Sequence, residues 1–393
     1  MGQVRWVGWT MAIATALVAA GGQVVRADIA SDKPAAILVY PDISVSSSEG
    51  EDTVIRLTNT NSATAIIAHC FFIDANSHCS GGTNNGAICT EDPGICTGLG
   101  FCVPGWQETD FHIQLTPGQP IEWKASDGLA DSQLPIQFGV CQRNPLRSCG
   151  GDADCNPFPG GPCTPSNAGT RIPPVPEDPF EGELKCIAID ANGVPVARND
   201  LKGEALLEGS TTTNFDVASY NAIGIQATGT SDGVANKLTL GGDSPEYNGC
   251  PNFLILNHFF DDARDPVPGT TGSIDTEIVL VPCTEDLLRQ IPGTAIVQYL
   301  VFNEFEQRFS TSKAVRCFQK IHLCNIDTPT CSRSIFNVNV AGTLSGQTRL
   351  NPVSGPGLSG LLGVAIEDHG DRSAAFNLHM QGARTDPDMI TIP

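Results

Sequence analysis

The stretch CFFIDAN, from Cys70 to Asn76, returns later in the chain as CIAIDAN, from Cys186 to Asn192. In both copies a cysteine precedes apolar residues of the kinds that favour β-strands. The second copy runs into Asn192-Gly193, a pair that is typical of a hairpin turn. We therefore expect two similar strands that neighbour or face each other and are joined by a disulfide between Cys70 and Cys186.

Apolar and polar residues alternate with a period of two in many other segments. Phe111, Ile113 and Leu115 alternate with polar residues in segment 110–115, as a half-buried strand requires. Segment 336–340 repeats this pattern. Further strands are expected in segments 36–45, 53–59, 65–73, 120–125, 134–141, 183–189, 253–260, 277–281, 294–303, 314–323, 361–366 and 374–380.

The composition favours strands and turns over long helices, with 41 Gly, 28 Pro and only 17% charged residues among 393. Short strands at near-regular spacing, without helical patterns between them, predict an all-β fold of two antiparallel β-sandwiches. The one expected helix covers segment 284–290, where Thr284 can cap the helix and Glu285 and Asp286 meet its positive end.

Eight of the cysteines form two similar sets of four, which recur at a nearly constant offset. The first set is Cys79, Cys89, Cys96 and Cys102, and the second is Cys141, Cys149, Cys155 and Cys163. The intervening residues are mostly Gly, Asn, Pro and Thr, so neither loop can bury enough surface to offset the entropy of ordering it. Two disulfides in each set would stabilise the loops. We therefore expect disulfide-stapled insertions at segments 78–105 and 141–172.

Metal binding is the alternative explanation for these loops. Zinc sites use short spacings such as Cys-x-x-Cys, which none of the 15 cysteines shows. Calcium could be held by Asp152 and Asp154, or by Glu91 and Asp92, but the chain has no twelve-residue calcium loop with its terminal Glu. We expect solubilising acids and no bound cofactor, with calcium as the open alternative.

The remaining cysteines lie in the C-terminal half, and we expect disulfides there as well. Cys324 and Cys331 flank the tight turn NIDTPT. Cys283 and Cys317 lie at or near strand candidates, and Cys250 is the expected leftover thiol. Cysteines 250, 283 and 317 allow three pairings, which the sequence leaves open.

The first 27 residues predict a cleaved secretion signal. One early charge, Arg5, precedes an apolar run, and Val25-Arg26-Ala27 offers small residues for cleavage. The apolar run is shorter than the ~20 residues that a membrane anchor, the alternative, would need. A net charge of −21 repels nucleic acid and anionic lipid. We expect a secreted protein, extracellular or periplasmic, with no nucleic-acid partner and no membrane span in its mature chain.

The segment ILVYPDISVSSSEGEDTVIRLTNTNSATAIIAHCFFI, residues 37–73, resembles the opening strands of immunoglobulin-like sandwiches in uncharacterised exported bacterial proteins. The Cys-Gly-Asp loops are similar to short loops of such proteins. The resemblance covers about half of the chain, favours immunoglobulin-like sandwiches and implies no activity. We expect two such domains, at residues 28–212 and 213–393. The boundary is placed at the polar run EGSTTTN.

Two motifs could carry hydrolytic chemistry. Gly229-Thr-Ser231-Asp-Gly233 matches the G-x-S-x-G pattern of hydrolases, but the residues after it predict a strand where that pattern needs a helix. Glu304 and Glu306 flank Phe305, so on a strand both carboxylates would emerge on one face about 7 Å apart, as in a glycosidase pair. The alternative for both motifs is an ordinary solvated loop or strand face.

Two histidines lie beside acids and are candidates for cation binding. His258 precedes Asp261, Asp262 and Asp265, and His369 lies in a segment with acids on both sides. The weak metal candidates in that second segment are Asp368 and Asp371. A charge-balanced loop is the alternative in both places.

The preferred function is a non-catalytic secreted or cell-surface protein with a structural, adhesive or binding role. Rigid strands that carry stapled loops suit this role, because binding residues concentrate on loops that a scaffold holds. The partner would be a cell-surface or extracellular protein or a glycan. The alternative is a secreted hydrolase that acts on carbohydrate, with Glu304 and Glu306 as its acid pair.

Overall fold

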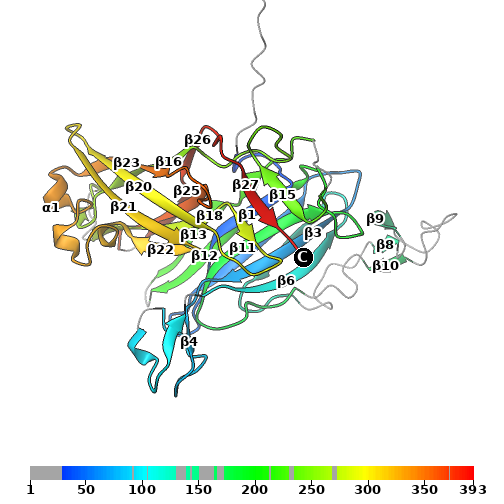
Figure 1. Cartoon of the computed structure of the whole chain (residues 1–393), viewed down its shortest axis with the longest axis horizontal. Coiled ribbons are helices and arrows are strands. Elements are labelled where there is room, and N and C mark those ends of the chain that lie inside the picture. The colour runs from blue at the N-terminus through cyan, green and yellow to red at the C-terminus, as the bar shows by residue number, and fades with distance from the viewer. Residues whose placement is uncertain are drawn as a thin grey trace, which may run out of the picture.

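The computed structural model is almost entirely β, as the sequence predicts (Figure 1). It describes residues 29–90, 93–103, 105–129, 139–141, 144–149, 163–165, 172–211, 214–229, 234–267, 272–370 and 372–393. The predicted secretion signal lies outside these ranges. No helix in them combines the length and the apolar character that a bilayer crossing needs.

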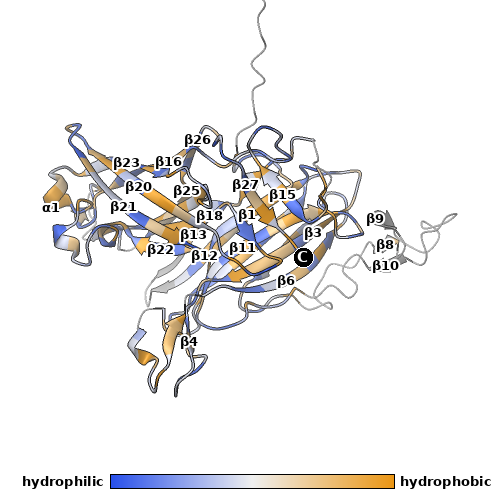
Figure 2. Ribbon diagram, viewed as in Figure 1, coloured by the Kyte–Doolittle hydropathy of each residue, from blue (hydrophilic) through white to orange (hydrophobic). Residues whose placement is uncertain are grey.

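A five-stranded antiparallel sheet forms the centre of the molecule. Its order is β14 (Ile223–Ile225), β1 (Ile37–Val45), β11 (Phe180–Ile189), β3 (Ile66–Asp74) and β6 (Gln107–Leu115). Every residue of β1 and β3 is buried. Such strands must be covered on both faces, which explains why most of their residues are apolar instead of alternating with polar ones. Apolar residues concentrate on the strands and polar residues in the loops (Figure 2).

One face of the central sheet packs against a four-stranded sheet. This second sheet has the order β13 (Asn214–Asn221), β12 (Leu201–Thr211), β2 (Asp52–Asn59) and β7 (Pro120–Lys124). The Tyr40 hydroxyl of β1 donates a hydrogen bond to the Arg56 carbonyl of β2, with 2.9 Å between the oxygens. Within the central sheet, Cys70 and Cys186 lie opposite each other on β3 and β11 and form the predicted disulfide.

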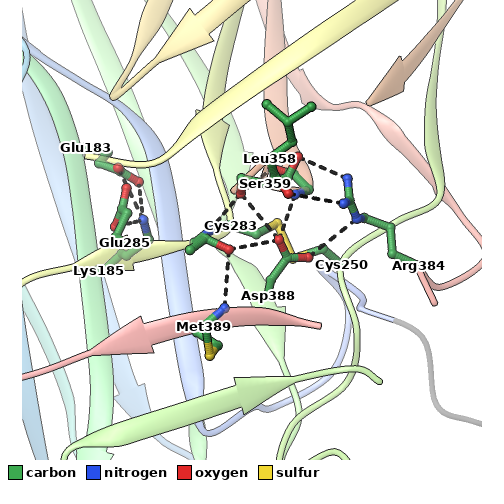
Figure 3. Close-up of a disulfide and its surroundings, with 12 residues drawn as sticks. Glu183, Lys185, Cys250, Cys283, Glu285, Leu358, Ser359, Arg384, Asp388 and Met389 are labelled. Carbon is green, nitrogen blue, oxygen red and sulfur yellow. Dashed lines mark hydrogen bonds and ion pairs between the residues drawn. A yellow bond between two sulfur atoms is a disulfide. The ribbon is translucent and has the colours of Figure 1, made fainter. Parts of the chain in front are cut away.

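The other face of the central sheet is covered by the C-terminal half of the chain. A small sheet of β15 (Lys237–Leu240), β27 (Asp388–Thr391) and β19 (Glu285–Asp286) lies over it. Lys185 of β11 pairs with Glu183 of the same strand, 3.1 Å away, and with Glu285 of β19 (Figure 3). All three side chains are at most 1% exposed. The two halves therefore share one buried core.

The C-terminal half contains two more sheets around a second core. The first is β21 (Arg308–Arg316), β20 (Thr294–Asn303), β23 (Ser345–Pro352), β16 (Phe253–Phe259) and β26 (His379–Gln381). The second contains β17 (Ala263–Arg264), β18 (Ser273–Pro282), β24 (Leu361–Asp368) and β25 (Ser373–Asn377), with β22 (Gln319–His322) paired to β18. Strand β25 adjoins β13, and β18 and β24 contact β1.

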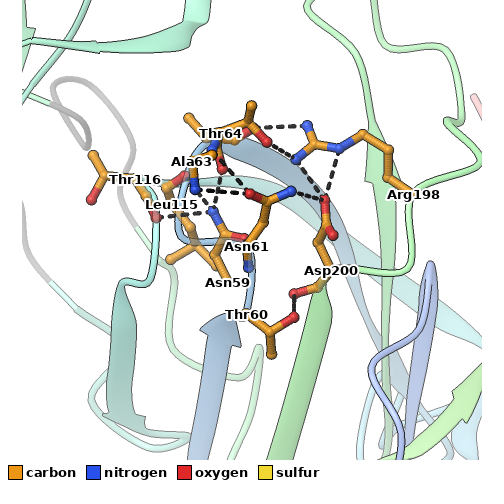
Figure 4. A network of polar contacts seen from close by, with 10 residues as sticks. Asn59, Thr60, Asn61, Ala63, Thr64, Leu115, Thr116, Arg198 and Asp200 are labelled. Atoms are coloured by element: carbon orange, nitrogen blue, oxygen red, sulfur yellow. Dashed lines mark hydrogen bonds and ion pairs between the residues drawn. The ribbon is translucent and has the colours of Figure 1, made fainter.

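A side-chain network builds the turn that follows β2 (Figure 4). Asn59 donates to the carbonyls of Thr64 and Thr116, each at 2.9 Å. Its Oδ1 accepts from the Asn61 amide at 3.0 Å. Arg198 donates to Asp200 and to the Ala65 carbonyl, each at 2.8 Å. Short polar side chains thus replace backbone partners, which is why this Thr-Asn-Thr-Asn sequence forms a turn.

Four of the predicted elements are wrong. The expected strand at 374–380 is divided between β25 and β26, which belong to different sheets. The expected helix at 284–290 is the short strand β19 followed by a turn, because Glu285 is buried against Lys185. The expected strand at 336–340 contains the one-turn helix α1 (Val338–Ala341), whose N-cap Asn337 accepts from the Asn339 amide. The expected strand at 314–323 is broken at Cys317, whose φ of 65° lets the chain pass from β21 in one sheet to β22 in another.

The described residues of the polar run EGSTTTN, at which a domain boundary was predicted, lie at the ends of β12 and β13, which form an antiparallel hairpin. After this hairpin, β14 pairs with β1 in the central sheet. The chain therefore continues through sheets of the N-terminal half beyond residue 213. The division into two domains stays a prediction.

The first cysteine-rich insertion is stapled as predicted. It contains β4 (His78–Ser80), the 3-10 turn Pro93–Ile95 and β5 (Phe101–Val103), and it leaves the main body at one side (Figure 1). Disulfides join Cys79 to Cys96 and Cys89 to Cys102. In the second insertion, β8 (Gly139–Cys141) pairs with β9 (Asn144–Cys149) and β10 (Cys163–Pro165), and Cys141 is disulfide-bonded.

The prediction that Cys250 is the unpaired thiol is wrong. Cys250 forms a disulfide with Cys283, with 6.5 Å between their Cα atoms, a separation that a disulfide spans without distortion of the backbone. Cys317 is buried and free at the crossing between β21 and β22. Cys324 and Cys331 are joined as predicted, between the 3-10 turns Leu323–Asn325 and Cys331–Arg333.

Candidate functional site

An open groove with a volume of about 720 Å³ lies over the adjoining ends of β16, β20 and β23. Burial alternates along β16 and β20, which turns one set of side chains into the core and leaves the other set at the surface. The surface set of these strands supplies aromatic and amide groups to the groove. Its lining includes Asn257, Phe259, Phe302, Glu304, Glu306 and Gln347.

The two acids of the predicted glycosidase pair both line this groove, but they do not lie on a strand. Glu304 and Glu306 belong to the turn that joins β20 to β21, and Glu306 has a φ of 60°. Their expected spacing on one strand face is therefore wrong. The turn is preferred here because the buried Asn303 accepts hydrogen bonds from the amides of Phe305 and Gln307, at 3.0 and 2.9 Å.

Asn303 fixes the hairpin to the body of the protein. Its Nδ2 donates to the Ala341 carbonyl at 2.8 Å and to Gln307 Oε1 at 2.7 Å. Glu304 is also held, because its Oε1 accepts from the hydroxyl of Ser345 at 2.6 Å. The acid-bearing turn is thus a fixed wall of the groove.

The floor of the groove combines amides with aromatic rings. Gln347 and Asn257 lie opposite each other on β23 and β16, and Gln347 donates to Asn257 with 3.2 Å between the atoms. Arg349 lies 5.7 Å from the centre of the Phe302 ring, within the range of a cation–π contact. Amides and carboxylates can bind hydroxyl groups, and aromatic rings can pack against apolar sugar faces.

A second hollow, of about 270 Å³, lies where β1 and β12 meet β18, β22 and β24. Lys320 of β22 is 2.9 Å from Ser44 Oγ, 3.4 Å from Asp42 Oδ1 and 3.8 Å from Glu277 Oε2. Burial opposes the charge of Lys320, but the attraction of Asp42 and Glu277 outweighs it and raises the pKa of Lys320. Lys320 thus connects acids from the two halves of the chain.

A histidine also lines this hollow, in which acids outnumber basic groups. His322 Nδ1 lies 3.1 Å from Asp275 Oδ2, and this hydrogen bond raises the pKa of His322 to about 9. The predicted metal candidate Asp368 lines the same hollow. Asp371, like Asp152, Asp154, Cys155 and Ser231, lies outside the described residues.

The two histidines that the sequence places beside acids have ordinary structural partners. His258 is buried, with Nδ1 2.8 Å from the Phe259 carbonyl and Nε2 2.8 Å from the Thr348 hydroxyl. Burial lowers the pKa of His258 to about 4. His369 is 2.8 Å from Glu367 and 3.1 Å from Asp265, and these hydrogen bonds raise its pKa although burial opposes this.

The sequence identified Glu304 and Glu306 as candidate site residues, but it did not identify the amides and phenylalanines that line the same groove. Asn257, Gln347 and Phe302 lie on three strands that are distant in sequence. Alternation along each strand could have marked each of them as outward-facing. Only the strand pairing brings them together.

No family model matches the chain, and no curated protein or solved structure is significantly similar to it. The immunoglobulin-like resemblance therefore stays a proposal.

Proposed function

We propose that the chain is an exported, non-catalytic binding protein that recognises a glycan through the groove over β16, β20 and β23. The observation that carries this proposal is the meeting of two partly exposed phenylalanines, two paired amides and two acids in one open groove. Hydroxyl-rich ligands with apolar ring faces match this set of groups. An open groove suits an extended chain better than a small apolar ligand, which needs an enclosing pocket.

Disulfides support the exported location, because they persist in oxidising compartments. The immunoglobulin-like character of the framework is part of the proposal. It is supported by the antiparallel sheets that pack face to face in each half of the chain.

The test is a glycan array followed by calorimetric titration of the best ligand. We expect Phe302→Ala to weaken binding by about tenfold, because a stacked aromatic ring contributes roughly 1 kcal/mol or more. Glu304→Gln should also weaken binding. Phe101→Ala is the matched control, since Phe101 is an exposed phenylalanine of the first insertion and should leave binding unchanged.

Hydrolysis is measured in the same samples as the appearance of new reducing ends. We expect none. Turnover that disappears in both Glu304→Gln and Glu306→Gln, with the fold intact, would establish the hydrolase instead. If Phe302→Ala and Phe101→Ala change the glycan affinity equally, the glycan binds elsewhere and the assignment of the groove is wrong.

A further inference from the structure

Three potential metal ligands meet at the base of the first cysteine-rich insertion. Asp74 is the last residue of β3, His78 is the first residue of β4, and Glu177 lies shortly before β11. Each offers one ligand atom, and these three atoms lie within 4.8 Å of one another. The acids come from segments that are about a hundred residues apart, so only the tertiary structure joins them.

Asp74 is held in place by the central sheet. Its backbone pairs with Gly182 of β11 on one side and with Gln107 of β6 on the other. The residue is 1% exposed, and among the described residues no donor reaches its buried Oδ2. A buried carboxylate oxygen without a partner is costly, so a further group is expected to meet it.

The Glu177 carboxyl group approaches Asp74 and increases the cost of its charge. The ligand oxygens of Glu177 and Asp74 lie within 4.8 Å of each other, and Asp74 is buried, so water screens their mutual repulsion poorly. Two neighbouring carboxylates need either a shared proton or a cation between them. A divalent cation would neutralise both charges.

Asn76 already orients both acids. Its backbone amide donates to Asp74 Oδ1 at 2.9 Å, and its Nδ2 donates to Glu177 Oε1 at 2.7 Å. His78 Nε2 lies 2.9 Å from the other oxygen of Glu177. Metal ligands are commonly held by such outer hydrogen bonds, which fix the direction of each donor atom.

We propose that Asp74, His78 and Glu177 form a binding site for a divalent transition-metal ion, with zinc as the representative ion. Two carboxylate oxygens and one imidazole nitrogen fit zinc and its neighbours in the first transition row. Calcium is disfavoured because it takes oxygen ligands only. The bound ion would connect the insertion to the segment that leads into β11. This metal site is separate from the groove proposed above, and the proposal does not depend on glycan binding there.

The site also has a route for the ion. The side chains of His78 and Glu177 are 27% and 23% exposed, whereas Asp74 closes the inner end. The ion can therefore enter from solvent without unfolding the sheet. The cysteines nearest in sequence are paired in disulfides and do not compete for the ion.

The experiment is a calorimetric titration of Zn²⁺ into the metal-free, disulfide-intact mature chain. We expect one saturable site, with affinity at least about tenfold weaker in His78→Gln and in Glu177→Gln. Binding should also raise the melting temperature of the wild type more than that of either variant. His379→Gln, which removes an exposed histidine of β26, is the matched control and should bind as the wild type does.

Three outcomes would overturn the proposal. The first is the absence of saturable binding below about 1 mM Zn²⁺, because an affinity this weak would not indicate a preformed zinc site. The second is equal binding by the wild type and His78→Gln. The third is a site that takes Ca²⁺ but not Zn²⁺. Glu177 is partly exposed, and Gln has nearly the same shape as Glu. Without metal, the Glu177→Gln variant is therefore expected to have the melting temperature of the wild type, which would show that its fold is intact.

Discussion

Lys185 and Glu285, which are 100 residues apart in the chain, form a buried ion pair that joins the central sheet to the C-terminal half. Glu183 completes the cluster from the strand of Lys185 (Figure 3). The cluster contains two carboxylates and one ammonium group, so burial raises the pKa of Glu183 well above its usual value. The two buried carboxylates at this contact between the halves therefore depend on Lys185 for their counter-charge.

Replacement of this lysine should destabilise the whole molecule. We expect Lys185→Met to lower the free energy of unfolding by about 3–5 kcal/mol, because two buried carboxylates lose their counter-charge. Urea denaturation followed by tryptophan fluorescence measures this loss.

The control for this variant is Lys124→Met. Lys124 forms a 2.6 Å ion pair with Glu208, but its side chain is 46% exposed. Exposed pairs contribute at most about 1 kcal/mol. Equal losses in the two variants would contradict the structural role assigned to Lys185.

The disulfides should differ in their contribution to stability. Cys70–Cys186 closes 116 residues, whereas Cys324–Cys331 closes only 7. Restriction of the unfolded chain predicts a loss of about 5 kcal/mol for the double alanine variant of the first pair and about 2 kcal/mol for the second. Chemical denaturation of the two variants checks the order, and a larger loss for the short loop would count against this entropic account.

The buried His258 should make the fold sensitive to acid. Its pKa of about 4 lies below the value of about 6.5 in an unfolded chain, so the unfolded state binds the proton first as the pH falls. Stability from this group is complete above pH 6.5 and decreases towards pH 4, by about 3 kcal/mol at most.

The variant His258→Gln isolates this effect. It should be less stable than the wild type at pH 7, and the difference should narrow as the pH falls to 4, because the variant lacks the titrating group. Urea midpoints at several pH values measure the difference. A constant difference across this range would show that His258 does not titrate as described.

Cys317 should be chemically inert until the protein unfolds. It is buried, and burial raises the pKa of its thiol, so little reactive thiolate forms. Iodoacetamide should modify no thiol in the native chain and one thiol in denaturant without a reductant. Intact mass measures both, and Cys317→Ala should remove the single modification. Labelling of Cys250 would contradict its disulfide with Cys283.

Local sequence patterns predicted most strands correctly, but they failed where a contact between distant residues determines the local structure. The prediction for β20 has the observed bounds, because its alternation reflects one buried and one exposed face. The helix predicted at 284–290 relied on a capping pattern, and that pattern carries no information about the distant partner of Glu285. Glu304 and Glu306 were predicted on one strand face, but they lie in a turn that depends on the buried Asn303, and only their place at the edge of one groove is common to both.

The sequence by itself determined that the chain is a disulfide-stapled all-β protein. Strand periodicity, turn residues and cysteine sets are local properties, and they act before distant segments meet. Only the tertiary structure decided that the central sheet is covered on both faces, that Cys250 rather than Cys317 is bonded, and that Asp74, His78 and Glu177 converge. Each of these depends on contacts between residues far apart in the chain, which become favourable only when burial and charge pairing are satisfied together.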